Sequence, residues 1–159
     1  EALAAFAADG GNILVSGAYI GTDIWDQIYP YEKDKDETAA AKKFAQNVLG
    51  YKWAANSASR RGTVRYLAND VLASLPAGNL QICNEINENQ YSIESPDGLT
   101  PALKSAASFM RYTDSGISAG ICNEGNGYRT VCLGFPIESL ESEEDIKRII
   151  TLTIEFFSR

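Results

Sequence analysis

The pattern of apolar and polar positions begins with a helix and a buried strand. Leu3 and Phe6 fall on one face among alanines, which predicts a helix over residues 1–9. A pair of glycines then ends this helix. An apolar run follows over residues 12–16, of the kind found in strands that are buried on both faces of a parallel sheet. The order of helix, turn and buried strand indicates an α/β fold.

Two further helices are expected. Over residues 38–49, alanines and an apolar stripe predict a helix that Thr38 caps and Gly50 ends. The chain closes with its strongest helical pattern, in which Ser142 and Asp145 approximate a capping box. In this last helix we expect Ile146, Ile149, Ile150 and Phe157 against the sheet, and Lys147, Arg148 and Glu155 in solvent.

Between these helices the pattern favours strands. The candidate strands cover residues 63–67, 80–83, 91–93, 108–113, 117–122 and 129–135. The last two flank a segment rich in Asn and Gly, which indicates a β-hairpin. A turn centred on Gly127 places Cys122 opposite Cys132, with Cβ atoms about 4.5–5.5 Å apart. Because a disulfide prefers about 3.8 Å, we expect two neighbouring thiols in the reduced state.

The spacing of Gly17, Tyr19 and Gly21 outlines a tight elbow after the first strand. Enzymes with a strand–elbow–helix site use the spacing G-x-X-x-G to hold a nucleophile. Glycine permits backbone angles that a Cβ would obstruct, and the turn aims N–H groups at a space for an anion or oxyanion. We expect residues 13–16 to form a central strand that ends in this turn. The alternative is a structural turn alone, since the middle residue is Tyr19 and the chain has no histidine.

Composition and charge restrict the function classes. The 159 residues suit one domain with a single core. A net charge of −7 argues against binding to nucleic acid. An anionic substrate would need local positive charge, and outside the helical pair Lys42 and Lys43 the adjacent basic residues are Arg60 and Arg61. No apolar run approaches the roughly 18 residues of a membrane span, so membrane insertion is not expected. Without histidine or a Cys-x-x-Cys spacing, neither a metal nor a cofactor is expected.

Motifs near both ends of the chain carry a resemblance to a known family. The matching segments are residues 10–23, 51–53, 109–112 and 131–138, and they span nearly the whole chain. With these segments the chain resembles the class I glutamine-amidotransferase-like, flavodoxin-like domain of large Bacteroidetes proteins described as xanthan lyases. The resemblance implies an α/β fold with a parallel sheet flanked by helices and a late β-hairpin.

The resemblance also implies catalytic positions, and this chain departs from them. Active amidotransferases carry a Cys at the elbow, and a His and an acid on a later segment. By position, Tyr19 stands in place of the nucleophile and Glu138 is the one plausible remnant of the acid. Ammonia release from glutamine needs a thiolate and its base. We therefore expect that this chain hydrolyses neither glutamine nor peptides. Because the family's sheet has strands before residue 1, residues 1–159 are interpreted as a single domain that lacks its first strands, as a fragment of a larger cell-envelope or secreted protein. The alternative is that a partner segment completes the fold.

Two binding functions follow from these residues. The first is a non-catalytic module of the larger protein, acting as a scaffold or as a surface for a ligand or for other domains of the same polypeptide. The second is carbohydrate binding by Tyr19, Trp25, Tyr29 and Tyr31, which follow the strand end where open α/β sheets bind ligands. The alternative role of these aromatic side chains is to pack the loop onto the sheet.

The third function is a polysaccharide lyase. Its base is Tyr19, and Arg60 or Arg111 neutralises the carboxylate of a uronate beside the proton that is removed. A cysteine hydrolase is less favoured, because all three cysteines occur in apolar strand contexts where thiols are usually inert.

Overall fold

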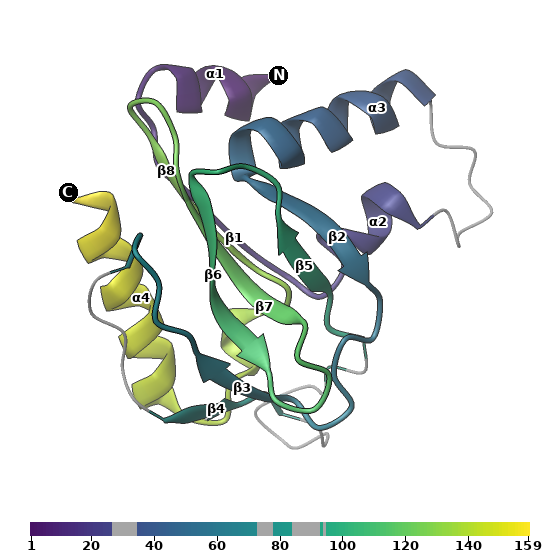
Figure 1. Ribbon diagram of the computed structural model, residues 1–159, viewed down its shortest axis with the longest axis vertical. Helices are drawn as coiled ribbons and strands as arrows, with labels where there is room; N and C mark the ends of the chain where they lie inside the picture. Colours follow the sequence, from purple (N-terminus) through teal and green to yellow (C-terminus); the bar gives the residue numbers. More distant parts are fainter. Residues whose placement is uncertain (27–34, 73–77, 84–92, 94) are drawn as a thin grey trace.

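The computed structural model describes residues 1–26, 35–72, 78–83, 93 and 95–159 (Figure 1). The helical elements are α1 (Ala2–Ala8), α2 (Thr22–Trp25), α3 (Lys35–Phe44), the π-helical turn η1 (Ala45–Leu49), the 3-10 turn η2 (Ile137–Ser139) and α4 (Glu143–Phe157). The strands are β1 (Ile13–Ser16), β2 (Tyr51–Ala55), β3 (Thr63–Tyr66), β4 (Asn79–Gln81), β5 (Gly98–Pro101), β6 (Ala106–Tyr112), β7 (Ser118–Glu124) and β8 (Arg129–Leu133).

The strands form one curled sheet in the shape of a half-barrel (Figure 1). Six of them follow the order β1-β8-β7-β6-β3-β4, while β5 pairs with both β7 and β2. β1 and β8 run parallel, and every other described pair is antiparallel. The register between β6 and β7 shifts twice between Ser108 and Arg111. Such bulges increase the local twist, which favours a curled sheet over a flat one.

The expected parallel sheet flanked by helices is therefore wrong, although the fold does mix helices and strands. The apolar run of β1 correctly indicated parallel pairing, but this applies to the β1–β8 pair alone among the described strands. The later strands are joined by short turns, and a short turn can connect only antiparallel neighbours. The expectation of a central strand over residues 13–16 is also wrong, because β1 lies at one end of the strand order.

Two clusters of buried side chains pack on the two faces of the sheet. On one face α4 covers β3, β6, β7 and β8, with a core that includes Val64, Phe109, Tyr112, Leu133, Phe135, Ile149 and Phe156. On the other face η1 and the end of α3 pack over β1, β2 and β5, with a core that includes Ile13, Ala45, Leu49, Tyr51, Leu99 and Ile121. Figure 1 shows α4 at the lower left of the sheet and α3 at its upper right.

The expected helices form, with differences at their ends. α1 confirms the first of them. α3 begins at Lys35, so Thr38 lies inside the helix and is not its cap. Gly50 does end the segment, with a φ of 83° that favours glycine. At α4 the side chain of Ser142 accepts a hydrogen bond from the Asp145 N–H, which confirms the predicted cap.

Most of the expected strands form with their ends displaced by a few residues. They correspond to β3, β4, β6, β7 and β8. Residues 91 and 92 lie outside the described residues, and Ile93 is buried but belongs to no strand. β2 and β5 are the two strands that the pattern did not predict.

The β7–β8 hairpin is present, but the predicted register of its cysteines is wrong. Glu124 pairs with Arg129 and closes a loop of even length, so the hairpin is not centred on one residue. In this register Cys122 lies opposite Val131, and Cys132 lies opposite Ile121. Because neighbouring residues of a strand point to opposite faces, the two thiols belong to different core clusters. All three cysteines are buried and none is assigned to a disulfide.

This arrangement predicts the thiol chemistry. After denaturation without a reductant, all three thiols should react with a disulfide reagent. In the native protein the same thiols should react slowly, because burial raises the pKa of Cys122 to about 12 and shields the sulfur from the reagent. Detection of a single reactive thiol in the denatured protein would mean that two cysteines are bridged, against the observed register.

Candidate functional site

The turn after β1 does present N–H groups to an anion, as its glycine spacing predicted, but the anion is a side chain of the protein itself. The N–H groups of Gly21 and Thr22 donate to Asp97 Oδ2 at 2.6 and 2.9 Å. The Thr22 hydroxyl donates to Asp97 Oδ1. Asp97 lies just before β5, far away in the sequence, and is fully buried. The carboxylate therefore ties β5 to the start of α2 and occupies the space above the strand end.

Burial raises the pKa of Asp97, and the hydrogen bonds from Thr22 and Gly21 oppose this rise. The neighbourhood is held by further polar contacts. The Trp53 Nε1–H donates to the Thr22 hydroxyl at 3.1 Å, and the Tyr112 hydroxyl donates to the Asp97 carbonyl at 2.9 Å. Since these groups satisfy one another, the Asp97 contacts make the end of the elbow a structural joint.

The glycines of the elbow have a steric role and not the conformational one that we expected. Neither Gly17 nor Gly21 has a positive φ. A Cβ on Gly21 would lie 2.7 Å from Cδ1 of Trp53, so any side chain there would force the indole away. Gly21 is required because β2 packs closely against the turn.

Of the aromatic residues proposed as a sugar platform, the structure describes Tyr19 and Trp25, which lie in different environments. Tyr19 is exposed at the elbow, with 40% of its surface accessible. Trp25 is only partly accessible, and its ring lies 6.0 Å from that of Tyr51 in the core on the η1 side of the sheet. Tyr29 and Tyr31 lie outside the described residues. Trp25 thus has the packing role that was its alternative.

The structure also separates the groups considered for catalysis. Glu138, the acid remnant, is exposed on η2. Arg111 on β6 lies directly opposite Arg65 on β3, and its buried Nε–H has no hydrogen-bond partner among the described residues. Tyr19 and Arg111 do not line the pocket that contains Arg60.

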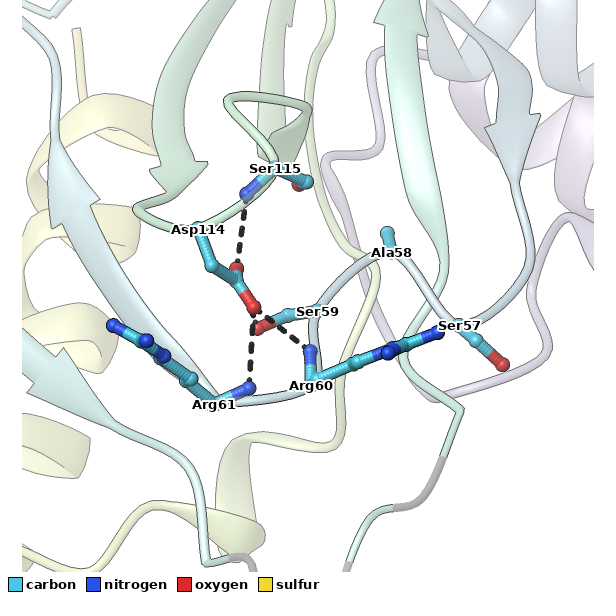
Figure 2. Close-up of a pocket in the computed structure, with 7 residues that line it drawn as sticks. All are labelled: Ser57, Ala58, Ser59, Arg60, Arg61, Asp114 and Ser115. Carbon is cyan, nitrogen blue, oxygen red and sulfur yellow. Dashed lines mark hydrogen bonds between the residues drawn. The ribbon is translucent and has the colours of Figure 1, made fainter.

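That pocket is a polar hollow among the described residues (Figure 2). It has a volume of about 470 Å³ and lies where the loop between β2 and β3 meets the turn between β6 and β7. Its lining consists of Ser57, Ala58, Ser59, Arg60, Arg61, Asp114 and Ser115. Two guanidinium groups and three hydroxyl groups give it many hydrogen-bond donors, which is the composition of an anion site.

Asp114 organises the loop through its carboxylate. This group accepts hydrogen bonds from the N–H groups of Arg60 and Arg61 at 2.9 and 3.2 Å, and from the Ser59 hydroxyl at 2.9 Å. Partial burial tends to raise the pKa of Asp114, but these donors outweigh it, and the pKa is lowered. The carboxylate is therefore ionised at neutral pH and is directed at the backbone of the loop. Its negative charge holds the loop in place instead of pairing with a guanidinium.

The arginine side chains extend away from this anchor. Figure 2 shows Arg60 and Arg61 leaving opposite sides of the Asp114 carboxylate, with Arg60 on the side of Ser57. Both residues are exposed. Among the described residues, no carboxylate lies within ion-pair distance of the Arg60 guanidinium. Arg60 therefore offers its charge to solvent at the mouth of the pocket.

Ser57 has an unusual backbone conformation. Its φ of 49° lies in the left-handed region, and it is the one non-glycine residue with a positive φ among the described residues. This conformation costs a non-glycine residue roughly 1–2 kcal/mol. Asn56 Oδ1 accepts the Ser57 N–H at 2.8 Å, and the Ser57 hydroxyl donates to that of Ser95 at 3.0 Å. Such outliers cluster at binding sites, which adds a second observation to the charge of the pocket.

Comparison of the chain with protein-family models, curated proteins and solved structures finds no significant match. Among the described residues, no helix has the length and apolar character needed to cross a membrane. Within the same residues, no group of His, Cys, Asp and Glu side chains is arranged to hold a metal ion.

Proposed function

We propose that this domain is a non-catalytic binding module of a larger cell-envelope or secreted protein, and that it binds an acidic group of a carbohydrate at the pocket of Arg60 and Arg61. The observation that carries the proposal is the Asp114 anchor. It fixes the loop through backbone N–H groups and leaves the Arg60 guanidinium to a ligand.

The size and chemistry of the pocket favour a carboxylate or sulfate on a sugar ring. Guanidinium groups bind carboxylates and sulfates through charge-assisted hydrogen bonds. Hydroxyl groups such as those of Ser57 and Ser115 suit the neighbouring hydroxyls of a sugar. A volume of about 470 Å³ admits one or two rings. The net charge of −7 opposes long polyanions at a distance, so recognition would rest on this local pair of cations.

The buried cysteines support a binding role rather than a catalytic one. Burial raises the pKa of both Cys122 and Cys132, so neither thiol supplies a thiolate near neutral pH. The N–H groups of Gly21, at the end of the elbow, and of Thr22 are already occupied by Asp97. These features support a non-catalytic module over a cysteine hydrolase or an amidotransferase.

The test is a titration of the isotope-labelled protein with a glucuronate oligosaccharide, followed by NMR. Resonances of residues 57–61 and 114–115 should shift, and a neutral glucose oligosaccharide of the same length should leave them unchanged. Arg60→Gln should weaken binding by about tenfold or more, because a hydrogen bond to a charged group contributes about 1.5–3 kcal/mol. Raising the ionic strength from 0.05 to 0.5 M should also weaken binding.

Lys104→Gln is the matched control. Lys104 is exposed between β5 and β6, at the opposite end of β6 from Asp114, so the variant removes a cation without touching the pocket. It should bind as tightly as the unmodified protein. Equal weakening by Lys104→Gln, equal affinity for the neutral oligosaccharide, or no binding of the glucuronate probe would each contradict the proposal.

A further inference from the structure

The edge strand β1 offers a row of outward backbone groups. The Gly17 N–H donates to the Leu133 carbonyl of β8 at 3.3 Å. Backbone groups of alternate residues in a strand point the same way, so Ile13 and Val15 also face β8. Leu14 and Ser16 must then point their N–H and C=O groups away from the sheet. Among the described residues, no strand pairs with this side of β1.

The same edge exposes an apolar side chain. Leu14 is 39% accessible, although it lies in a strand. Its partner on β8 is Val131, which belongs to the core beneath α4. Paired residues of adjacent strands point to the same face, so Leu14 lies on the α4 face of the sheet, at its border.

One flank of α4 continues this apolar border. The Asn12 side chain donates to the Phe157 carbonyl at 3.2 Å, which places the end of α4 beside the start of β1. Ile150 and Ile154 lie on the same side of α4 as Phe157, because the three residues are spaced four and three apart. Ile150 is 41% accessible and Ile154 is 58% accessible. An unpaired strand edge with an exposed apolar stripe beside it is a typical interaction surface.

The charges on this flank are mixed and already paired. Glu143 and Lys147 lie on the same side of α4 as the two isoleucines and form an ion pair at 3.9 Å. A surface that carries both signs in this way is complementary to itself. The outer edge of β1 is also complementary to itself, because each residue that faces outward supplies one N–H donor and one C=O acceptor.

We propose that a second copy of this chain docks on this surface through a two-fold axis that passes near Val15. The two β1 strands pair antiparallel, so that Leu14 of one copy exchanges backbone hydrogen bonds with Ser16 of the partner subunit. A two-fold axis perpendicular to the sheet keeps both α4 helices on the same face. The isoleucine stripes of the two helices then face each other across the axis. The sheet becomes continuous through the dimer, and the open edge of each copy is covered.

The first test is sedimentation of the whole chain over a range of concentrations at physiological salt. A reversible dimer is expected. Ile154→Lys should weaken dimerisation by at least tenfold without affecting folding, because this side chain is exposed in the monomer. Leu3→Lys is the matched control, since Leu3 on α1 is similarly exposed, at 55%, but lies beside α3, on the face of the sheet opposite α4. This control should dimerise as the unmodified protein does.

Hydrogen exchange provides the second test. The amides of Leu14 and Ser16 should become protected as the concentration rises, and Ile154→Lys should abolish that protection. The Gly17 amide should be protected at every concentration, because it is bonded to β8. A monomer at all concentrations, equal weakening by Leu3→Lys, or a dimer in which the Leu14 amide stays unprotected would each overturn the proposal.

Discussion

Asp97→Ala is expected to lower the free energy of unfolding by about 3–5 kcal/mol. The substitution removes the acceptor for the N–H groups of Gly21 and Thr22 and for the Thr22 hydroxyl, all in a buried site. Each buried donor left without a partner costs about 1–3 kcal/mol. Since domains of this size are commonly stable by about 5–15 kcal/mol, the loss should be visible as a large fall in the urea midpoint.

Asp97→Asn is the control that separates hydrogen bonding from charge. Its oxygen still accepts the two backbone N–H groups, and its amide donates to the Thr22 hydroxyl. The expected cost is therefore about 1 kcal/mol at neutral pH. A cost equal to that of Asp97→Ala would mean that the negative charge, and not the set of acceptors, holds the joint together.

The pH dependence of the stability difference between the unmodified protein and Asp97→Asn tests the raised pKa of Asp97. A carboxyl group whose pKa is higher in the folded state than in the unfolded state binds its proton more tightly when folded. Its contribution to stability is complete below the unfolded pKa of about 3.9 and is lost as the pH rises through the folded value. The stability of the unmodified protein relative to Asp97→Asn should therefore fall as the pH rises above about 4, by up to about 1.4 kcal/mol per unit. If the stability of the unmodified protein relative to Asp97→Asn instead rises with pH, the hydrogen bonds from Gly21 and Thr22 outweigh burial and lower the pKa of Asp97.

Ile149→Ala is expected to cost about 2–5 kcal/mol, whereas Ile150→Ala should cost well under 1 kcal/mol. Ile149 is fully buried in the core beneath α4, and its truncation leaves a cavity. Ile150 is 41% accessible on the flank of the same helix. The two positions are adjacent and have the same side chain, so differences in helix propensity cancel.

Denaturation of the two variants at a low protein concentration gives the comparison directly, since dilution removes any contribution from self-association. Two losses of similar size would show that α4 is rotated relative to the arrangement described here. A large loss for Ile150→Ala alone would assign the core face to the opposite flank.

Local patterns identified most of the elements, and their pairing was the part that failed. The cap at Ser142 and the left-handed Gly50 are local features, and both were predicted because the chemistry involves neighbouring residues. The position of β1 in the sheet depends on contacts with β8, more than a hundred residues away, so an apolar run alone could not decide between centre and edge. The face of α4 was predicted correctly at Ile149 but wrongly at Ile150, which is 41% accessible, because both residues fit an apolar stripe.

In the candidate site, too, the local features could be predicted from the sequence and the distant contacts could not. The adjacent Arg60 and Arg61 were noticed from the sequence as a local source of positive charge. Their anchor, Asp114, lies in a turn-like segment that ends in Gly116, and nothing in that segment indicates which loop it will contact. Asp97 sits between Pro96 and Gly98, another turn-like context, although it is among the most deeply buried polar residues. In both cases the turn residue has a role only through its distant partner.

The parallel pairing of β1 with β8 sets the order in which the molecule can be assembled. The Asn12 side chain accepts the N–H of Arg129, which lies 117 positions away in the sequence, and the β1–β8 register begins one residue later. During synthesis the amino-terminal segment emerges first, yet its partner strand is made near the end. Closing a loop of this length costs several times RT before any contact is gained, so the local β7–β8 hairpin should form first. Until then Ala7 and Ile13, which the folded protein buries, remain available to other chains, which makes the ribosome-bound nascent chain the stage at which this fold is most exposed to misassociation.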